Sequence, residues 1–260
     1  MNIDKILHIC THAGKILLES GAETYRVEET IVRVCKSFGV DFAESYVTPT
    51  GIMVSIYDKE KNTKTLITRI KVRNNNLQKI HLVNDLSREI TAHTLSLDEV
   101  EKKLFEIERT KAYPFYLTLL ASGLAAACLT ILVGGGVVDS ISCFFIGVGI
   151  RLLCIAGERL LLNGFFINII GGAFASSIAI LLYIIGVPVE VNYVIIGSIM
   201  LLVPGLAITN AIRDTISGDL LSGLTRGAEA IFVAVSIAIG TGSVLSIWIN
   251  YLGGSIKWHN

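Results

Sequence analysis

The residues with the clearest capacity for chemistry gather in one segment, which reads LLVPGLAITNAIRDTISGDLLSGLTRGAEA from Leu201. Amide, guanidinium and carboxylate side chains follow one another there at short spacing: Asn210, Arg213, Asp214, Asp219 and Arg226. Arginine binds a carboxylate through two parallel hydrogen bonds, and an aspartate at a membrane boundary can carry a proton. The segment therefore predicts a binding or gating site for a small substrate with opposite charges, with a carboxylate able to take up a proton.

A helix breaker precedes these polar residues. Pro204 has no amide hydrogen and its ring clashes with the carbonyl four residues earlier, so a helix must kink or end there. Gly205 permits the altered backbone. Broken helices occur at membrane depth where the freed backbone groups face protein or a water-filled cavity, as in many transporters. We therefore assign Pro204 and Gly205 to the same substrate-binding or gating segment.

A simpler interpretation stays open beside this one. The segment is then a solvated cytoplasmic loop whose arginines only fix the topology. On a helix, Asn210 and Asp214 share one face, whereas the neighbours Arg213 and Asp214 point about 100° apart. A direct pair between Arg213 and Asp214 is therefore not assumed.

The elements that carry this segment belong to a chain with two different halves. Of the 44 charged residues 33 lie before Pro114, whereas 20 of the 24 glycines follow it among apolar residues. This shift predicts a polar N-terminal domain over residues 1–112 and a transmembrane domain over residues 113–260. Small residues in the second half, among them Gly147 and Gly172, predict close helix packing.

Apolar windows after Pro114 predict the transmembrane helices, since a span needs about 20 apolar residues. There are five such windows, at about residues 115–133, 139–156, 165–186, 192–208 and 231–252. The first 20 residues contain no apolar stretch typical of a signal peptide. Basic residues fall in alternate connections, at Arg151 and Arg159 and again at Arg213 and Arg226, which places these connections and the N-terminus in the cytoplasm.

The polar half alternates between helical and strand periodicity. Helices are predicted over residues 2–20, 23–38, 77–94 and 97–110, and strands over residues 40–47, 51–57 and 63–72. Ser96 and Glu99 predict a capping box at the last helix. The fold class is therefore a membrane all-α bundle of five transmembrane helices with an N-terminal cytoplasmic α+β domain.

Several other functions are disfavoured by the composition. His8 and His12 share a helical face, but no third ligand is identifiable, so we predict no metal and no cofactor. The five cysteines form no CxxC pair and are odd in number, and we expect them to be reduced. No nucleophile with an adjacent base, phosphate-binding glycine loop or basic stripe is present. An enzyme or a nucleic-acid-binding protein is therefore not expected.

Three stretches of the chain resemble a known family. The segment from Leu201 resembles the signature of the threonine/serine exporter family, and LLESGAETYRVEETIVRVCKSFGV and TPTGIMVS resemble its cytoplasmic domain, as does LNGFFIN its membrane part. The simplest interpretation of Glu23, Arg26 and Glu28 in the first of these runs is charge pairing at a helix N-terminus. The resemblance covers most of the chain and corresponds to the shorter, YjjP-like form of the family.

The resemblance implies a function and a location. It implies export of threonine, serine or, in some relatives, a small dicarboxylate, across the plasma membrane of a prokaryote. It also implies an oligomer and a separate small five-span membrane subunit as partner. We therefore expect a subunit of a secondary transporter. The alternative is a membrane-anchored metabolite sensor or assembly scaffold that transports nothing itself.

Overall fold

The computed structural model describes residues 2–57, 62–92, 95–110 and 113–253. It divides into two compact units, which are described separately. The first unit combines Met1–Lys111 with Leu206–Gly227, and the second combines Ala112–Gly205 with Ala228–Asn260. The first unit thus includes a C-terminal segment that the predicted boundary at residues 112 and 113 assigned to the membrane domain.

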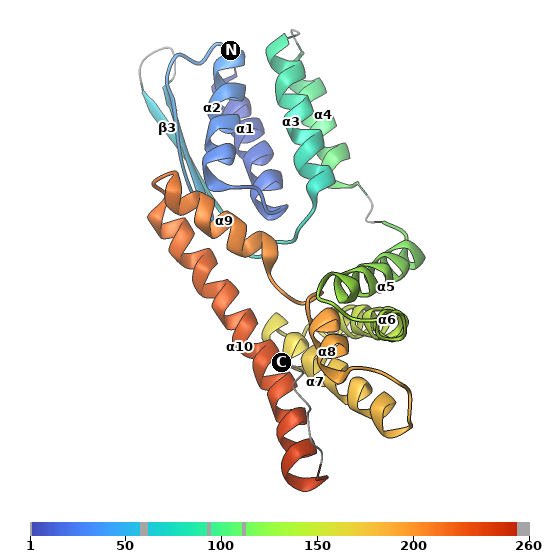
Figure 1. The fold of residues 1–260 in the computed structure, drawn as a ribbon. Helices are drawn as coiled ribbons and strands as arrows, with labels where there is room; N and C mark the ends of the chain where they lie inside the picture. Colours follow the sequence, from blue (N-terminus) through green and yellow to red (C-terminus); the bar gives the residue numbers. More distant parts are fainter. Residues whose placement is uncertain (1, 58–61, 93–94, 111–112, 254–260) are drawn as a thin grey trace. The chain divides into compact units, whose positions relative to one another are not determined.

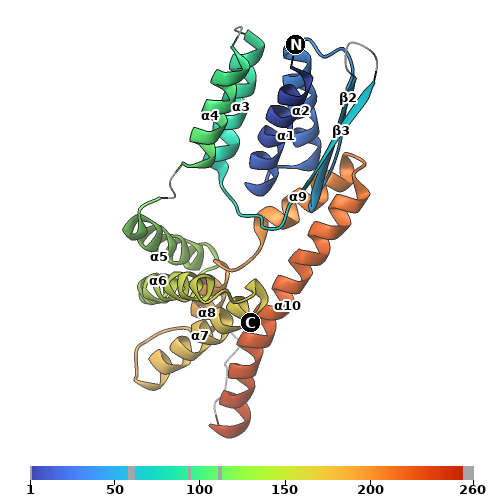
Figure 2. The same ribbon diagram turned by 180° about the vertical axis from the view of Figure 1, so that it is seen from behind.

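The first unit contains an α+β domain built in layers (Figures 1 and 2). Its helices and strands follow in the order α1 Ile3–Glu19, α2 Thr24–Ser37, β1 Ala43–Thr48, β2 Gly51–Tyr57, β3 Thr63–Arg69, α3 Leu77–Ala92 and α4 Leu97–Glu108. The strands form an antiparallel sheet in the order β1-β2-β3, with Val47 opposite Ile52 and Val54 opposite Leu66. Helices α1 and α2 lie between this sheet and the pair α3 and α4 (Figure 1).

Helix α1 forms the centre of this domain. Apolar residues are buried along almost its whole length, including Ile6, Leu17 and Leu18, because it packs on the sheet and on three helices. Burial of such side chains is the main stabilising term in a domain of this kind. The predicted helices and strands are all confirmed within a few residues, as is the capping box of Ser96 and Glu99. Predicted helix residues 93 and 94 lie outside the described residues.

Two further helical segments complete the first unit. Helix α9 covers Gly205–Ile216, and α10 covers Leu220–Tyr251, of which the part up to Gly227 belongs to this unit. A tight turn joins them, with Gly218 at a φ of +93° and a hydrogen bond of 2.8 Å from Asp219 N to Asp214 O. Helix α9 lies across the ends of α1 and α2 where the α1–α2 loop joins them (Figures 1 and 2).

The second unit holds the long apolar helices. It contains α5 Phe115–Leu132, α6 Val137–Arg159, α7 Gly164–Ile184, α8 Val191–Ile199 and the rest of α10. Within the described residues, four helices are long and apolar enough to cross a membrane, namely α5, α6, α7 and α10. They coincide with four of the five predicted spans, although α10 begins about ten residues before the predicted one.

The remaining predicted span, residues 192–208, is not one helix. Helix α8 has nine residues and rises about 14 Å, roughly half of the hydrocarbon thickness. The backbone then leaves the helical conformation over Met200–Pro204 and returns to it in α9 at Gly205. The described residues therefore contain four helices with the length and composition of a span, and the fifth predicted span contains a short helix and a turn. Pro204 accounts for the difference because it cannot continue a helix.

Small residues bring the helices of the second unit into close contact. A Cβ atom at Gly147 would lie 2.8 Å from the Ser122 carbonyl oxygen of α5, and one at Gly172 would lie 2.9 Å from the Ile237 oxygen of α10. Backbones can approach this closely only where no side chain separates them. The predicted packing role of these glycines is confirmed.

Candidate functional site

A buried charged site forms inside the first unit, where the α1–α2 loop meets α9 and the start of α10. Gly21 ends α1 with a φ of +91°, a conformation that favours glycine. Hydrogen bonds of 2.8 Å from Asn74 N to Glu19 O and of 3.0 Å from Asn76 N to Ser20 O hold the loop from the other side. The loop therefore presents its backbone and the first turn of α2 to α9 in a fixed conformation.

Asp214 of α9 is the centre of the site. Its side chain is fully buried, and Oδ1 accepts hydrogen bonds from the hydroxyl and the amide of Thr24, at 2.9 and 3.3 Å. Thr24 is the first residue of α2, and the N-cap residue Glu23 makes no side-chain cap of its own. A carboxylate is favoured at a helix N-terminus by the unpaired amides and the helix dipole. Asp214 therefore caps α2 from another helix.

Arg226 of α10 neutralises this carboxylate. Its Nε lies 3.1 Å from Oδ2 of Asp214, and the residue is only 4% exposed. Arg226 also donates a hydrogen bond of 2.8 Å from Nη2 to the Ala22 carbonyl oxygen. Asn210, one turn before Asp214, donates a hydrogen bond of 3.0 Å to the Gly21 carbonyl oxygen. Three side chains from α9 and α10 thus bind the α1–α2 loop and the first residue of α2. We call these three residues, Asn210, Asp214 and Arg226, the clamp.

The rim of the clamp carries a second ion pair. Arg213 pairs with Glu23, whose other carboxylate oxygen lies 3.0 Å from Nε of Arg26. The Arg213 side chain is about half exposed, whereas that of Glu23 is only 11% exposed. Arg213 and Asp214 therefore have different partners, in agreement with the divergence expected for neighbours on a helix.

Asp219 brings another carboxylate to the clamp. Its Oδ2 lies 3.2 Å from the Thr24 hydroxyl that already donates to Asp214. A hydroxyl has one hydrogen to donate, so Thr24 cannot donate fully to both carboxylates at once. Asp214 and Asp219 therefore compete for one donor.

The electrostatics of the site raise the pKa of two carboxyl groups. Burial raises the pKa of Asp214 above its usual range, the hydrogen bonds from Thr24 and the charge of Arg226 oppose this, and Asp219 adds to the increase. Burial also raises the pKa of Glu28 on α2, against the effect of a 2.8 Å hydrogen bond from Val47 N, with further increases from Asp219 and Asp214. The clamp and its surroundings can therefore take up protons more readily than exposed carboxylates.

The structure brings together five of the seven predicted site residues. Asn210, Arg213, Asp214, Asp219 and Arg226 all lie in the first unit around the α1–α2 loop. Pro204 and Gly205 belong to the second unit, and the chain passes from one unit to the other directly after them.

Sequence reasoning did not identify the partners of these residues. The simple interpretation gave Glu23, Arg26 and Glu28 pairs within one helix, which holds only for Arg26 and Glu23. No local pattern in the sequence connects Thr24, or the carbonyl groups of Gly21 and Ala22, with a segment about 190 residues away. The sequence marks these residues in one way only: they lie in the run GAETYRVEE, which resembles the family.

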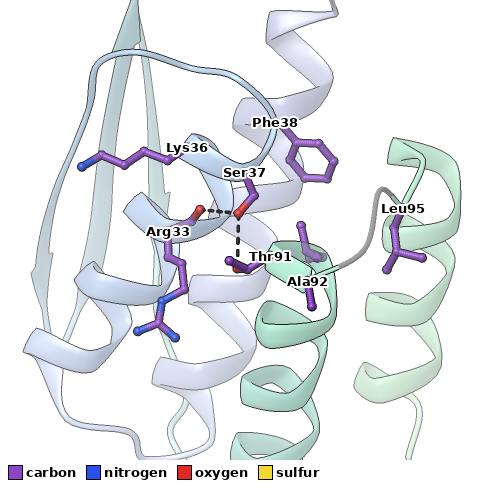
Figure 3. A pocket seen from close by; sticks show the side chains of 8 residues that line it. Arg33, Lys36, Ser37, Phe38, Thr91, Ala92 and Leu95 are labelled. Atoms are coloured by element: carbon purple, nitrogen blue, oxygen red, sulfur yellow. Dashed lines mark hydrogen bonds between the residues drawn. The ribbon is translucent and has the colours of Figure 1, made fainter.

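A separate hollow of about 490 Å³ lies at the other end of α2 (Figure 3). It is lined by Arg33, Lys36, Ser37, Phe38, Ile90, Thr91, Ala92 and Leu95. The Ser37 hydroxyl donates 2.9 Å to the Arg33 carbonyl oxygen and lies 3.3 Å from the Thr91 hydroxyl. Arg33 pairs with Glu29, and Figure 3 shows Lys36 extending away from Thr91. Its cations are thus already paired or directed elsewhere.

The histidines predicted to share a helical face have no metal-like environment. His12 Nε2 lies 3.1 Å from Oε2 of Glu108, and its ring packs beside Phe105. In the part of the chain that the structure describes, no group of three or more His, Cys, Asp or Glu side chains is arranged to hold a metal ion. The contact that the structure gives His12 is thus with the carboxyl group of Glu108.

Four long apolar helices in a chain that also contains a compact polar domain define a multi-pass membrane protein. Its family follows from a match over residues 8–248 to the family described as "Putative threonine/serine exporter". The chain belongs to this family, which confirms the resemblance noted in its sequence. No solved structure matches the chain.

Curated relatives show two lengths. The chain is 27% identical over 249 residues to the "Probable succinate transporter subunit YjjP" of Escherichia coli (strain K12), with 94% of each chain covered. It is 24% identical over 244 residues to the "Threonine/serine exporter" of Corynebacterium glutamicum, covering 91% of this chain and 50% of that protein. The chain thus matches nearly all of the shorter relative and about half of the longer one.

Proposed function

We propose that the chain is a subunit of a secondary transporter that exports small amino acids such as threonine and serine, or a related small carboxylate, from the bacterial cytoplasm. Family membership and the names of the relatives support a transporter of small metabolites. The observation that carries the proposal is the buried ion pair of Asp214 and Arg226, because the residues of the exporter-like signature converge on it. Helix α10 begins at this clamp and continues as an apolar span.

The clamp is the gating element of this proposal. Asp214 and Arg226 form an ion pair, and each also makes hydrogen bonds to the α1–α2 loop or to Thr24, so the closed state leaves neither charge without a partner. The contact between Oδ2 of Asp214 and Nε of Arg226 is electrostatic and lacks the geometry of a hydrogen bond. Breaking a buried pair is costly unless other charges replace it. A substrate with an ammonium and a carboxylate group offers a new partner to both Asp214 and Arg226. A proton on Asp214 removes the negative charge that holds Arg226. Substrate and proton therefore both favour opening.

The remaining parts of the transporter follow from the sequence pattern. The polar domain and the N-terminus lie in the cytoplasm, since the basic residues fall in alternate connections. The interrupted stretch of α8 and Met200–Pro204 supplies the fifth crossing, with its irregular backbone facing protein or water and not lipid. A small five-span subunit of the same family completes the pathway, in line with the word "subunit" in the name of the E. coli relative.

The proposal is tested by efflux from loaded cells. Cells that accumulate threonine, serine or succinate are compared with and without this gene, each with and without a candidate small subunit. Loss of the gene should raise the intracellular level of one solute, and Arg213→Ala and Asp214→Ala should abolish its efflux. Arg88→Ala is the control, since Arg88 is exposed and pairs only with Asp85 beside it. The amount of each variant in the membrane fraction separates loss of transport from loss of insertion.

A second candidate is a membrane-anchored sensor or assembly scaffold. The hollow at the end of α2 favours it, because a metabolite-binding domain needs such a site (Figure 3). The efflux experiment decides between the two. Unchanged efflux of every tested solute, in the gene deletion and in both alanine variants, would leave the sensor as the better description.

A further inference from the structure

A second pocket, of about 230 Å³, lies on the other side of the α1–α2 loop from the clamp. It is formed by the end of α1, the linker from β3 to α3, the start of α3 and the end of α4, and it is lined by Ile16, Glu19, Ser20, Val72, Asn74, Asn76, Lys79 and Glu108. Pockets for drug-sized ligands measure roughly 300–1,000 Å³. A volume below this range suits a small solute.

The pocket has a cation on one side. Lys79 donates a hydrogen bond of 2.7 Å from Nζ to the Glu108 carbonyl oxygen, an uncharged acceptor. An ammonium group has three hydrogens to donate. Among the described residues, no carboxylate lies within 4.0 Å of this ammonium in an ion pair. Lys79 therefore has both charge and donors available for an anionic group.

Carboxylates line the same pocket, those of Glu19 and Glu108. The nearest cation to the Glu19 carboxylate is Lys15, at the limiting distance of 4.0 Å, and Lys15 also lies 3.9 Å from Glu108. Glu108 has a closer neighbour in His12, at 3.1 Å. Glu19 is thus the acid with the weaker pairing. The lining thus combines one ammonium group with two carboxylates, and it also includes Asn74 and Asn76.

We propose that this pocket binds a free α-amino acid as a regulator of the transporter. The carboxylate of the ligand faces Lys79, and its ammonium group faces Glu19 and Glu108. A small zwitterion offers a partner both to the ammonium group and to the carboxylates of the lining, whereas a dicarboxylate adds negative charge near Glu19. This proposal rests on the proposed function, because it assigns a sensing site to the polar domain of an amino acid exporter.

The pocket and the clamp share one short loop. Ser20 lines the pocket. The carbonyl oxygens of the next two residues, Gly21 and Ala22, accept hydrogen bonds from Asn210 and Arg226 of the clamp. The linker is fitted closely over this loop, since a Cβ atom at Gly21 would lie 2.9 Å from Oδ1 of Asn75. A ligand that moves the linker must therefore move the loop that the clamp holds. Occupancy of the pocket sets how firmly the clamp is closed.

Calorimetric titration of the full chain in lipid nanodiscs tests this proposal. We expect threonine or serine to bind, with affinity about tenfold weaker in Lys79→Met, as for one lost charge-assisted hydrogen bond. Glu19→Gln should weaken amino acid binding without weakening succinate binding, and Lys79→Arg should retain part of the affinity. Lys36→Met, in the hollow of Figure 3, is the matched control and should leave affinity unchanged. The melting temperature of each variant verifies folding.

Three outcomes would overturn the proposal. They are absence of amino acid binding by the unmodified chain, affinity that is equal in Lys79→Met, Glu19→Gln and the control, and succinate bound more tightly than amino acids with a further gain in Glu19→Gln. Equal affinity across the variants would mean that a transport site elsewhere binds the ligand. Efflux is measured separately. Export without a Lys79-dependent site refutes only this pocket, and a Lys79-dependent site without export refutes only the proposed transport.

Discussion

The Thr24 hydroxyl donates a hydrogen bond of 2.9 Å to the Asp214 carboxylate, and both side chains are fully buried although 190 residues separate them. Through this bond, a residue of α9 caps the first turn of α2. The contact joins the two stretches of sequence that most resemble the exporter family. Loss of this contact should therefore affect both the stability of the first unit and transport.

Asp214→Asn should destabilise the first unit strongly. The asparagine keeps an acceptor for Thr24 but removes the negative charge 3.1 Å from the buried guanidinium of Arg226, a change that costs about 3–5 kcal/mol. The melting temperature of the purified chain should fall, and efflux should be lost. Asp85→Asn is the control, because Asp85 is 46% exposed and its surface contacts with Arg88 and His81 each contribute no more than about 1 kcal/mol. Equal melting temperatures for both variants would contradict a buried ion pair at Asp214.

Thr24→Val should remove only the shared hydrogen bond. The side chain keeps its shape, but the two carboxylates lose their common donor, at a cost of about 1–3 kcal/mol. Thr24→Ser retains the hydroxyl and should restore most of the stability. In Thr30→Val the lost hydroxyl bonds only the Arg26 carbonyl of its own helix, so a cost below about 1 kcal/mol is expected. Thermal unfolding of the three variants checks this order.

Glu28→Gln should stabilise the protein, and the gain should depend on pH. The pKa of Glu28 is raised, chiefly by burial and also by Asp219 and Asp214, so the folded chain binds its proton more tightly than the unfolded chain. For such a group, stability falls as pH rises from the unfolded pKa through the folded pKa. The glutamine keeps an acceptor for Val47 N and removes the charge.

The expected result is an increase in melting temperature that is larger at about pH 7 than at about pH 5, since acid already neutralises part of the glutamate. Melting curves of the two proteins at both pH values provide the measurement. A gain that is the same at both values, or larger in acid, would show that the Glu28 charge carries no cost in the folded state.

Gly223→Ala should force α9 and α10 apart. A Cβ atom at this position would lie 2.9 Å from the Ala211 carbonyl oxygen and in direct conflict with Thr215, at a cost of about 1–3 kcal/mol. In Gly227→Ala, one turn further along α10, the nearest atom would be the Ala211 Cβ at 4.0 Å. Alanine there should stabilise the helix by about 0.5–1 kcal/mol. Melting temperatures that shift in the same direction would disprove the close approach at Gly223.

Much of this fold is predictable from local patterns. The helices and strands of the polar domain follow from periodicities of 3.6 and 2 residues, and the break at Pro204 follows from the chemistry of proline. The end of α8 at Ile199, before Pro204, does not follow from such patterns, because hydropathy over residues 192–208 is continuous across the break. Hydropathy does not record the direction of the backbone, so it cannot distinguish one span from a short helix and a turn.

The site was predictable only in part. The polar residues from Asn210 to Arg226 stand out by type and spacing, but their partners depend on a tertiary contact between distant segments. Asp214 shows this limit most clearly, since its hydrogen bond to Thr24 and its ion pair to Arg226 involve three different helices. Residues that meet in this way leave no periodic signal, and only the likeness of both stretches to one family connected them.

Arg226 and Asn210 bind carbonyl oxygens of the main chain, at Ala22 and Gly21. Every amino acid carries such an oxygen, so a substitution at residue 22 changes a side chain without deleting the acceptor. What these two donors recognise is the spacing and direction of successive peptide groups. An insertion or deletion in the four residues between α1 and α2 should therefore be tolerated far less than an exchange of one small residue for another.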